Sequence, residues 1–156
     1  DALLNVARTN GSGLTSDDVN SMNNGLKLPV ALQMTCLTSR FVSWFTRAGS
    51  NSTIDEELLL RQGGGAIATW GPTGADSVAA HDGLLAGFLK KLWGVNYQPT
   101  LGELTQASRL EMLTSYPAAK AVIFSFVLLG DPMTKVRKNV ANVYVPSTMR
   151  VMAAGW

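Results

Sequence analysis

The sequence predicts an α/β fold with a mainly parallel sheet. Two short apolar runs, Val30 to Thr35 and Ala66 to Trp70, lack the polar alternation of half-exposed strands. Such runs are typical of strands that are covered by helices on both faces. Segments with helical spacing or capping signals precede and follow each of them. With 156 residues, 46% of them hydrophobic and 15% charged, the chain can bury a substantial core.

The first strand is preceded by a short predicted helix at about residues 16–24. Thr15 offers a capping hydroxyl before an acidic first turn, and Gly25 closes the segment. Pro29 then opens the first strand, which leads directly into Cys36.

A second helix and the second strand follow the same logic. Thr53 to Glu56 form a capping box, and the helix that it begins is expected to end at Gly63 to Gly65. The strand Ala66 to Trp70 comes next and stops at the turn Gly71 to Gly74.

Two longer helices are predicted after this turn. Residues 79–93 carry apolar side chains at helical spacing, and Thr100 caps a helix that reaches about Leu113. The apolar stretch Ala118 to Leu128 fits either a buried helix or a strand, and we favour the helix. Gly130 to Pro132 should break it.

The last residues are harder to assign. Residues 133–136 and 142–145 fit terminal strands or the start of a following module. We expect residues 1–136 to be the C-terminal half of one catalytic domain and residues 137–156 to be a linker or the start of that module. Two clear strands cannot cover the apolar faces of four or five helices, so further strands are expected from polypeptide upstream of Asp1.

Composition argues against several classes of function. The formal charge of +2 is spread along the chain without a basic run, which disfavours nucleic-acid binding. No apolar stretch approaches the roughly 20 residues of a membrane span. A single cysteine excludes an internal disulfide and a multi-cysteine metal site, and we expect neither a metal nor another cofactor. Gly63 to Gly65 end a helix before a strand, which is the reverse of the order in a phosphate loop.

Cys36 is the candidate nucleophile. It stands just past the carboxyl end of a buried parallel strand, where open α/β sheets bind their ligands. The alternative is an inert cysteine that serves as core packing. Spacing alone does not decide between the two.

Several segments around Cys36 resemble the gingipain-type cysteine peptidases. They are Leu14-Thr15 with Asp18-Val19, Leu28-Pro29-Val30 with Met34 to Thr38, Thr53 to Leu60, Gly64 to Ala68 with Gly71 to Gly74, His81-Asp82, Leu101 to Glu103, and Val127 to Pro132. The resemblance covers roughly residues 14–136 and implies a caspase-like α/β/α sandwich. It also implies a secreted or cell-surface bacterial endopeptidase that cleaves peptides or proteins with Cys36 as its nucleophile.

The family's catalytic histidine, which is followed by glycine, precedes the cysteine, whereas the only histidine here, His81, follows it. By the resemblance, the catalytic histidine should lie on an upstream half of the same precursor, and the isolated chain should be inactive. His81 fits a structural role at a helix start better than that of the base. The alternative function is an inactive structural or assembly subunit with the same fold.

Trp70 and Gly71 are the candidate substrate-binding residues. The resemblance places Trp70 at the wall of the substrate pocket and the turn from Gly71 to Gly74 at its rim, with a buried core tryptophan as the alternative. Asp55, Glu56 and Glu57 stand in a first helical turn, where acidic side chains favour the helix dipole, and receive no catalytic role.

Overall fold

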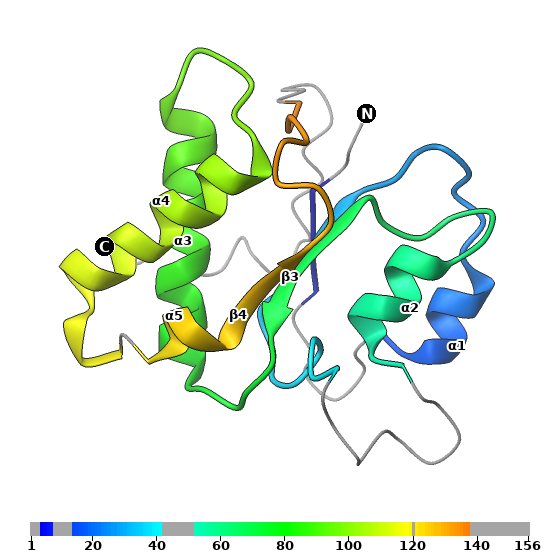
Figure 1. Ribbon diagram of the computed structural model, residues 1–156, viewed down its shortest axis with the longest axis horizontal. Helices are drawn as coiled ribbons and strands as arrows, with labels where there is room; N and C mark the ends of the chain where they lie inside the picture. The colour runs from blue at the N-terminus through cyan, green and yellow to red at the C-terminus, as the bar shows by residue number, and fades with distance from the viewer. Residues whose placement is uncertain (1–3, 8–13, 42–51, 120, 138–156) are drawn as a thin grey trace, which may run out of the picture.

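The sheet has four strands in the order β1-β2-β3-β4 (Figure 1). The computed structural model describes residues 4–7, 14–41, 52–119 and 121–137. Strands β1, β2 and β3 run parallel, and β4 is antiparallel to β3. The elements are β1 (Leu4–Ala7), α1 (Ser16–Ser21), β2 (Val30–Gln33), α2 (Ile54–Leu60), β3 (Ala68–Pro72), α3 (Val78–Gly94), α4 (Leu101–Ser115), a 3-10 turn (Pro117–Ala119), α5 (Val122–Ser125) and β4 (Phe126–Leu129).

Helices lie on both faces of the sheet, as predicted. Figure 1 shows α1 and α2 on one side of the strands and α3, α4 and α5 on the other. All four residues of β2 and all five of β3 are buried, which agrees with strands covered on both faces.

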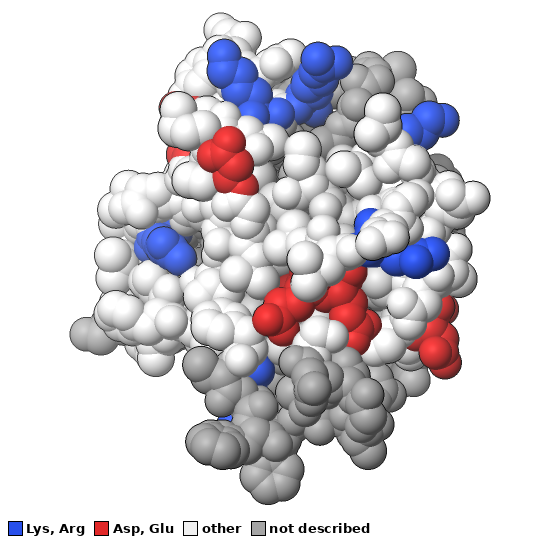
Figure 2. Space-filling model, turned by 45° about the vertical axis from the view of Figure 1, so that its right-hand side comes forward, with Lys and Arg blue, Asp and Glu red and all other residues white. Residues whose placement is uncertain are grey.

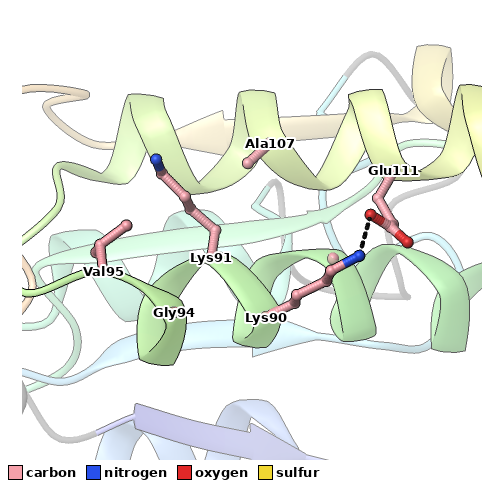
Figure 3. A pocket seen from close by; sticks show the side chains of 7 residues that line it. Lys90, Lys91, Gly94, Val95, Ala107 and Glu111 are labelled. Carbon is pink, nitrogen blue, oxygen red and sulfur yellow. Dashed lines mark hydrogen bonds and ion pairs between the residues drawn. The ribbon is translucent and has the colours of Figure 1, made fainter.

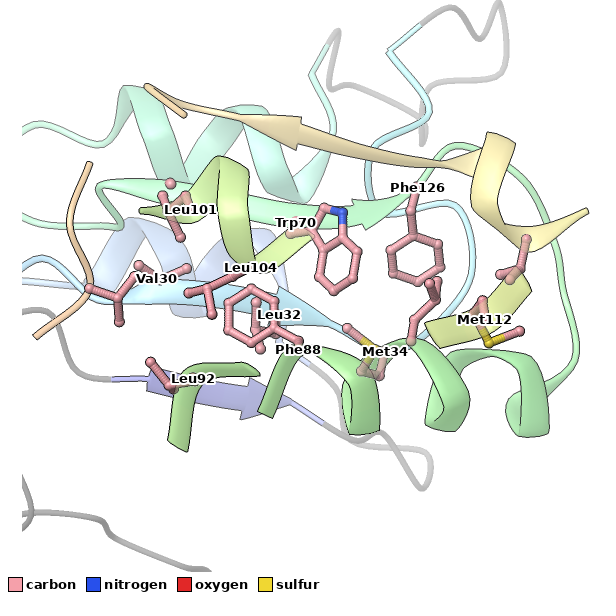
Figure 4. Packing of buried hydrophobic residues seen from close by; sticks show 14 of the residues in the cluster. Val30, Leu32, Met34, Trp70, Phe88, Leu92, Leu101, Leu104, Met112 and Phe126 are labelled. Atoms are coloured by element: carbon pink, nitrogen blue, oxygen red, sulfur yellow. The ribbon is translucent and has the colours of Figure 1, made fainter. Parts of the chain in front are cut away.

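The larger core lies between the sheet and the pair α3–α4 (Figure 4). Trp70 is at its centre, with ring centroids 5.5 Å from Phe88 and 5.2 Å from Phe126. A smaller cluster on the other face joins Val19, Ala31, Leu58 and Ala66. Alternate residues of β2 therefore serve the two cores, because successive side chains of a strand point to opposite faces.

The predicted helix starts are confirmed. Thr15, Thr53 and Thr100 each form a capping box with the acidic residue three positions later. The first helix ends at Ser21, earlier than predicted, and β3 begins at Ala68, two residues later than predicted. Each difference is at an element boundary, where local sequence signals are weakest.

The favoured helix over Ala118 to Leu128 is wrong for its second half. The chain makes only the four-residue helix α5 there, and Phe126 then begins β4, which pairs with β3 from Pro72 back to Thr69. Pairing with β3 gives partners to the backbone groups on one side of this edge strand and decides a stretch whose local preferences were balanced.

The chain end differs as well. Residues 133–136 form no strand and contribute one isolated bridge, between Lys135 and Thr100. Residues 142–145 lie outside the described residues, as do residues 138–156 of the predicted linker or following module. In the described parts of the chain, no helix is both long and apolar enough to cross a lipid bilayer.

Candidate active site

Cys36 is exposed on a turn that follows the carboxyl end of β2. Met34 is still buried, and exposure begins only as the chain leaves the sheet. The Cys36 thiol donates a weak hydrogen bond to the backbone carbonyl of Asp76, with 3.6 Å between sulfur and oxygen. Leu37, the next residue, has φ +66°, a left-handed conformation that is uncommon for a leucine. The structure therefore shows an exposed thiol and not one that packs in the core.

Two loops from neighbouring strand ends meet at Cys36. We call residues 36–39 the cysteine turn. The amide of Leu37 donates to the carbonyl of Gly74 at 3.2 Å, and the amide of Ser39 donates to the carbonyl of Pro72 at 3.1 Å. The loop after β3 is itself held by the amide of Thr73, which donates to the carbonyl of Ser125 at 2.7 Å. The thiol is thus presented where parallel strands end, the usual ligand edge of such sheets.

Asp55 lies buried under the cysteine turn. Its side chain is 0% exposed, although it stands in the first turn of α2. The hydroxyl of Ser39 donates to its Oδ2, and its own amide donates to the carbonyl of Thr38 at 3.3 Å. Burial raises the pKa of Asp55 to about 6, while the hydrogen bond from Ser39 and the nearby polar side chains of Thr38 and Gln33 act in the opposite direction.

Nothing in the sequence distinguished Asp55 from the two glutamates that follow it. An acidic residue in a first helical turn is common and is usually exposed to solvent. The signal that singles out Asp55 is its burial, and this depends on which side of α2 faces the ends of β2 and β3.

His81 lies in the core, in the first turn of α3. It is 2% exposed and meets the ring of Phe126 edge-on at 5.3 Å between centroids. Burial lowers the pKa of the ring, and the nearby carboxylate of Asp76 and a hydrogen bond to the backbone of Met34 oppose this. Its Nε2 finds no partner among the described residues. An imidazole enclosed in this way is placed for packing in the core, which is consistent with the structural role expected for it.

The two candidate substrate-binding residues are not at the surface. Trp70 is 0% exposed between Phe88 and Phe126 (Figure 4), which is the placement of the core alternative. Gly71 is also buried, because it is part of β3 and not of the loop beyond it. A Cβ at position 71 would lie only 2.5 Å from the Asp55 carboxylate. The chain becomes partly exposed again at Thr73.

A hollow of about 350 Å³ lies elsewhere, between α3 and α4 (Figure 3). It is lined by Gly87, Lys90, Lys91, Gly94, Val95, Ala107 and Glu111. Lys90 and Glu111 form an ion pair of 3.0 Å across it. Its lining comes from the second half of α3, whereas Asp76, the neighbour of Cys36, precedes that helix. The hollow therefore shares no residue with the cysteine turn or with Asp76.

Charged side chains do not gather into one field on the face shown in Figure 2. Basic and acidic groups form separate small clusters with uncharged surface between them. Among the residues that the structure describes, no three His, Cys, Asp or Glu side chains are grouped as metal ligands would be.

Solved structures share this fold over most of the chain. A complex of Porphyromonas gingivalis RgpB pro- and mature domains aligns with a TM-score of 0.72 and 17% identity, over 86% of this chain and 34% of that one. The Arg-specific cysteine proteinase gingipain R gives a TM-score of 0.65 and 18% identity, over 87% and 32%. A structure described as a protease gives 0.71 and 14%, over 85% and 35%.

The chain thus spans about a third of the length of these solved chains. No curated protein matches it in sequence. The similarity to gingipain structures confirms the caspase-like α/β/α sandwich. The model of peptidase family C25 matches residues 5–137. The chain therefore belongs to peptidase family C25, the gingipain family of cysteine peptidases.

Proposed function

We propose that this chain is the cysteine-bearing part of an endopeptidase domain, with Cys36 as the nucleophile. One observation carries the proposal: in a chain of family C25, the sole cysteine is exposed on a turn at the carboxyl edge of a parallel sheet. Residues 1–136 would form the C-terminal half of the catalytic domain. Residues 137–156 would form a linker or the start of a following module.

The reaction would follow the usual course for a cysteine nucleophile. The thiol proton passes to a histidine, and the sulfur attacks the carbonyl carbon of the scissile peptide bond. The imidazolium then protonates the leaving amine, which departs as the C–N bond breaks and leaves an acyl-enzyme. Water hydrolyses this thioester and restores the thiol. The amide of Cys36 would be one donor to the oxyanion.

The histidine would come from a segment that precedes Asp1 in the same precursor. His81 is the only histidine of the chain, and it is enclosed in the core. Aligned gingipain structures are about three times as long as the matched region, so a complete domain of this type has room for the missing group. A histidine followed by glycine there would supply the base and a second oxyanion donor. The isolated chain would then be inactive.

A secreted or cell-surface location in a bacterium is part of the same proposal and is supported by the family. The substrate would be a peptide or a protein. One of the aligned structures is a complex of pro- and mature domains, which supports a partner that derives from the same precursor.

An inactive structural or assembly subunit is the second candidate. It is favoured by the burial of the single histidine, because an exposed thiol without a base has little catalytic power. A residue other than histidine in the expected upstream position would support it.

Active-site labelling separates the two candidates. The protein, purified with the upstream half, is treated with peptidyl acyloxymethyl ketones that differ in the side chain before the ketone, and its intact mass is followed. In an active site, the Cys36 sulfur forms a thioether and the carboxylate leaves. We expect one adduct per chain, absent in Cys36→Ser and lost when the upstream half is removed. Labelling only after denaturation would refute the enzyme and leave the structural subunit.

A further inference from the structure

The carboxylate of Asp55 is buried, and no cationic side chain among the described residues is paired with it. Its exposed fraction is 0%, whereas Glu56, the next residue of α2, is only half-buried. No lysine or arginine in the described parts of the chain forms an ion pair with it. Buried carboxylates are costly unless they are paired or hydrogen-bonded, and such groups are frequent at functional sites.

The polar contacts of Asp55 are directed to the cysteine turn. Oδ2 accepts from the hydroxyl of Ser39, which is itself 0% exposed. The Asp55 amide donates to the carbonyl of Thr38 at 3.3 Å. Both partners follow Cys36 within three residues, so the first turn of α2 and the cysteine turn are joined at two points.

The cysteine turn needs such support. Leu37 has φ +66°, a conformation that persists for a leucine only when the surroundings impose it. The strand ends hold it on one side, through the bond from the Leu37 amide to Gly74 and the bond from the Ser39 amide to Pro72. Asp55 holds the same segment from α2, through Ser39 and Thr38.

The Asp55 carboxylate lies in a tightly packed space next to Gly71. A Cβ on Gly71 would lie 2.5 Å from Asp55 Oδ2 and 2.7 Å from Thr38 Oγ1, distances that side chains do not tolerate. Only the absence of a side chain at position 71 lets the carboxylate lie against the end of β3.

From these contacts we infer that Asp55 is a positioning residue, which acts through Ser39 to hold the turn that presents the Cys36 thiol. The inference rests on the proposed function of Cys36 and extends it to a group under the site.

This support should depend on pH. Burial raises the pKa of Asp55 to about 6. The side chains that face it, from Gln33 of β2 and from Thr38 and Ser39 of the cysteine turn, are polar but uncharged. The charged neighbour that acts on it among the described residues is Glu56 of its own helix. Above the pKa, the ionised carboxylate accepts a charge-assisted hydrogen bond from Ser39, which is stronger than the bond of the neutral acid.

Labelling kinetics test the inference on the assembled protein with its upstream half. The rate of adduct formation at Cys36 is measured from pH 5 to 8 for Asp55→Asn, Ser39→Ala and the double variant. Asp17→Asn, a matched change in the exposed first turn of α1, is the control.

At pH 7.5 each single variant should label about tenfold more slowly, because small displacements of a reacting group cost that much or more. The double variant should be no slower than either single one. The ratio between the wild type and Asp55→Asn should fall toward one at pH 5. The inference would be overturned by equal labelling rates for the wild type and Asp55→Asn at all pH values. It would also be overturned if the double variant were slower by the product of the two single effects.

Hydrogen exchange of residues 37–41 provides the readout that is independent of catalysis. Protection of the Leu37 and Ser39 amides should fall about tenfold in Asp55→Asn, while α3 and α4 stay protected, which also shows that the variant is folded. Unchanged protection would refute the positioning role. The wild type could also fail to react with the label while Asp55→Asn still shows the loss of amide protection. That result would refute the proposed enzyme and would support the role of Asp55 in positioning the turn.

Discussion

Replacing Asp55 by asparagine should stabilise the protein at neutral pH. The amide keeps the size of the carboxyl group and can accept from Ser39, but it carries no charge into the core. The folded-state pKa of Asp55 is about 6, against an ordinary value of 3.8. At 1.36 kcal/mol per pKa unit, burying the ionised form costs about 3 kcal/mol.

The sign follows from proton binding. A raised pKa means that the folded state holds the proton more tightly than the unfolded state, so the wild type loses stability as the pH rises from about 4 to about 6. Well below pH 4 the carboxyl group is neutral in both states, and above pH 7 the whole cost is present. The stability gained in Asp55→Asn should therefore grow by roughly 2 kcal/mol between pH 4 and pH 7, and by about 3 kcal/mol between pH 2 and pH 7.

Urea unfolding of the assembled protein at several pH values measures this difference, with Asp17→Asn as the exposed control. The control should follow the wild type, because Asp17 is exposed. A gain that is independent of pH, or a variant that becomes less stable relative to the wild type as the pH rises, would show that Asp55 is compensated by a cation. The reasoning about its burial would then be refuted. If Asp55→Asn is more stable than the wild type but its Cys36 reacts more slowly, the wild type has lower stability in return for function, a common trade-off in enzymes.

Three further changes test the packing around the site by thermal unfolding of the assembled protein. Gly71→Ala should destabilise the protein by about 1 to 3 kcal/mol, because the new methyl group meets a carboxylate and a hydroxyl. The control Gly94→Ala, with open space around it, should leave the stability nearly unchanged. Equal effects of the two changes would contradict the crowding at the end of β3. Trp70→Ala should cost about 3 to 5 kcal/mol through the cavity that it leaves, well above the cost for half-exposed Trp93, and a small loss would place the indole outside the core. Thr100→Ala should cost about 1 kcal/mol through loss of the capping box of α4, and an unchanged melting temperature would argue that the cap is dispensable.

Much of the fold could be predicted because its signals are local. A hydroxyl at Thr53 and a carboxylate three residues later satisfy the first amides of a helix wherever that helix lies. The unbroken apolar run at Val30 likewise indicates a covered strand without reference to its neighbours. Strand pairing is different, because β4 exists only where β3 offers it an edge. The sequence analysis did not predict the strand β1 either. Its four residues carry little local signal, and it forms by pairing with β2.

The site divides in the same way. The sequence itself contains the order of buried strand, cysteine and glycine-rich turn. This order predicted Cys36 as the candidate nucleophile and indicated the resemblance to the gingipain family. The sequence alone determined which residue could be the nucleophile, because the chain has one cysteine and it follows a buried strand. Only the tertiary structure decided that Trp70 and His81 belong to the core and that Asp55 lies under the cysteine turn. The physical reason is that burial is a property of the neighbours that packing brings together, and residues such as Ser39 and Asp55 meet only when α2 folds against the sheet.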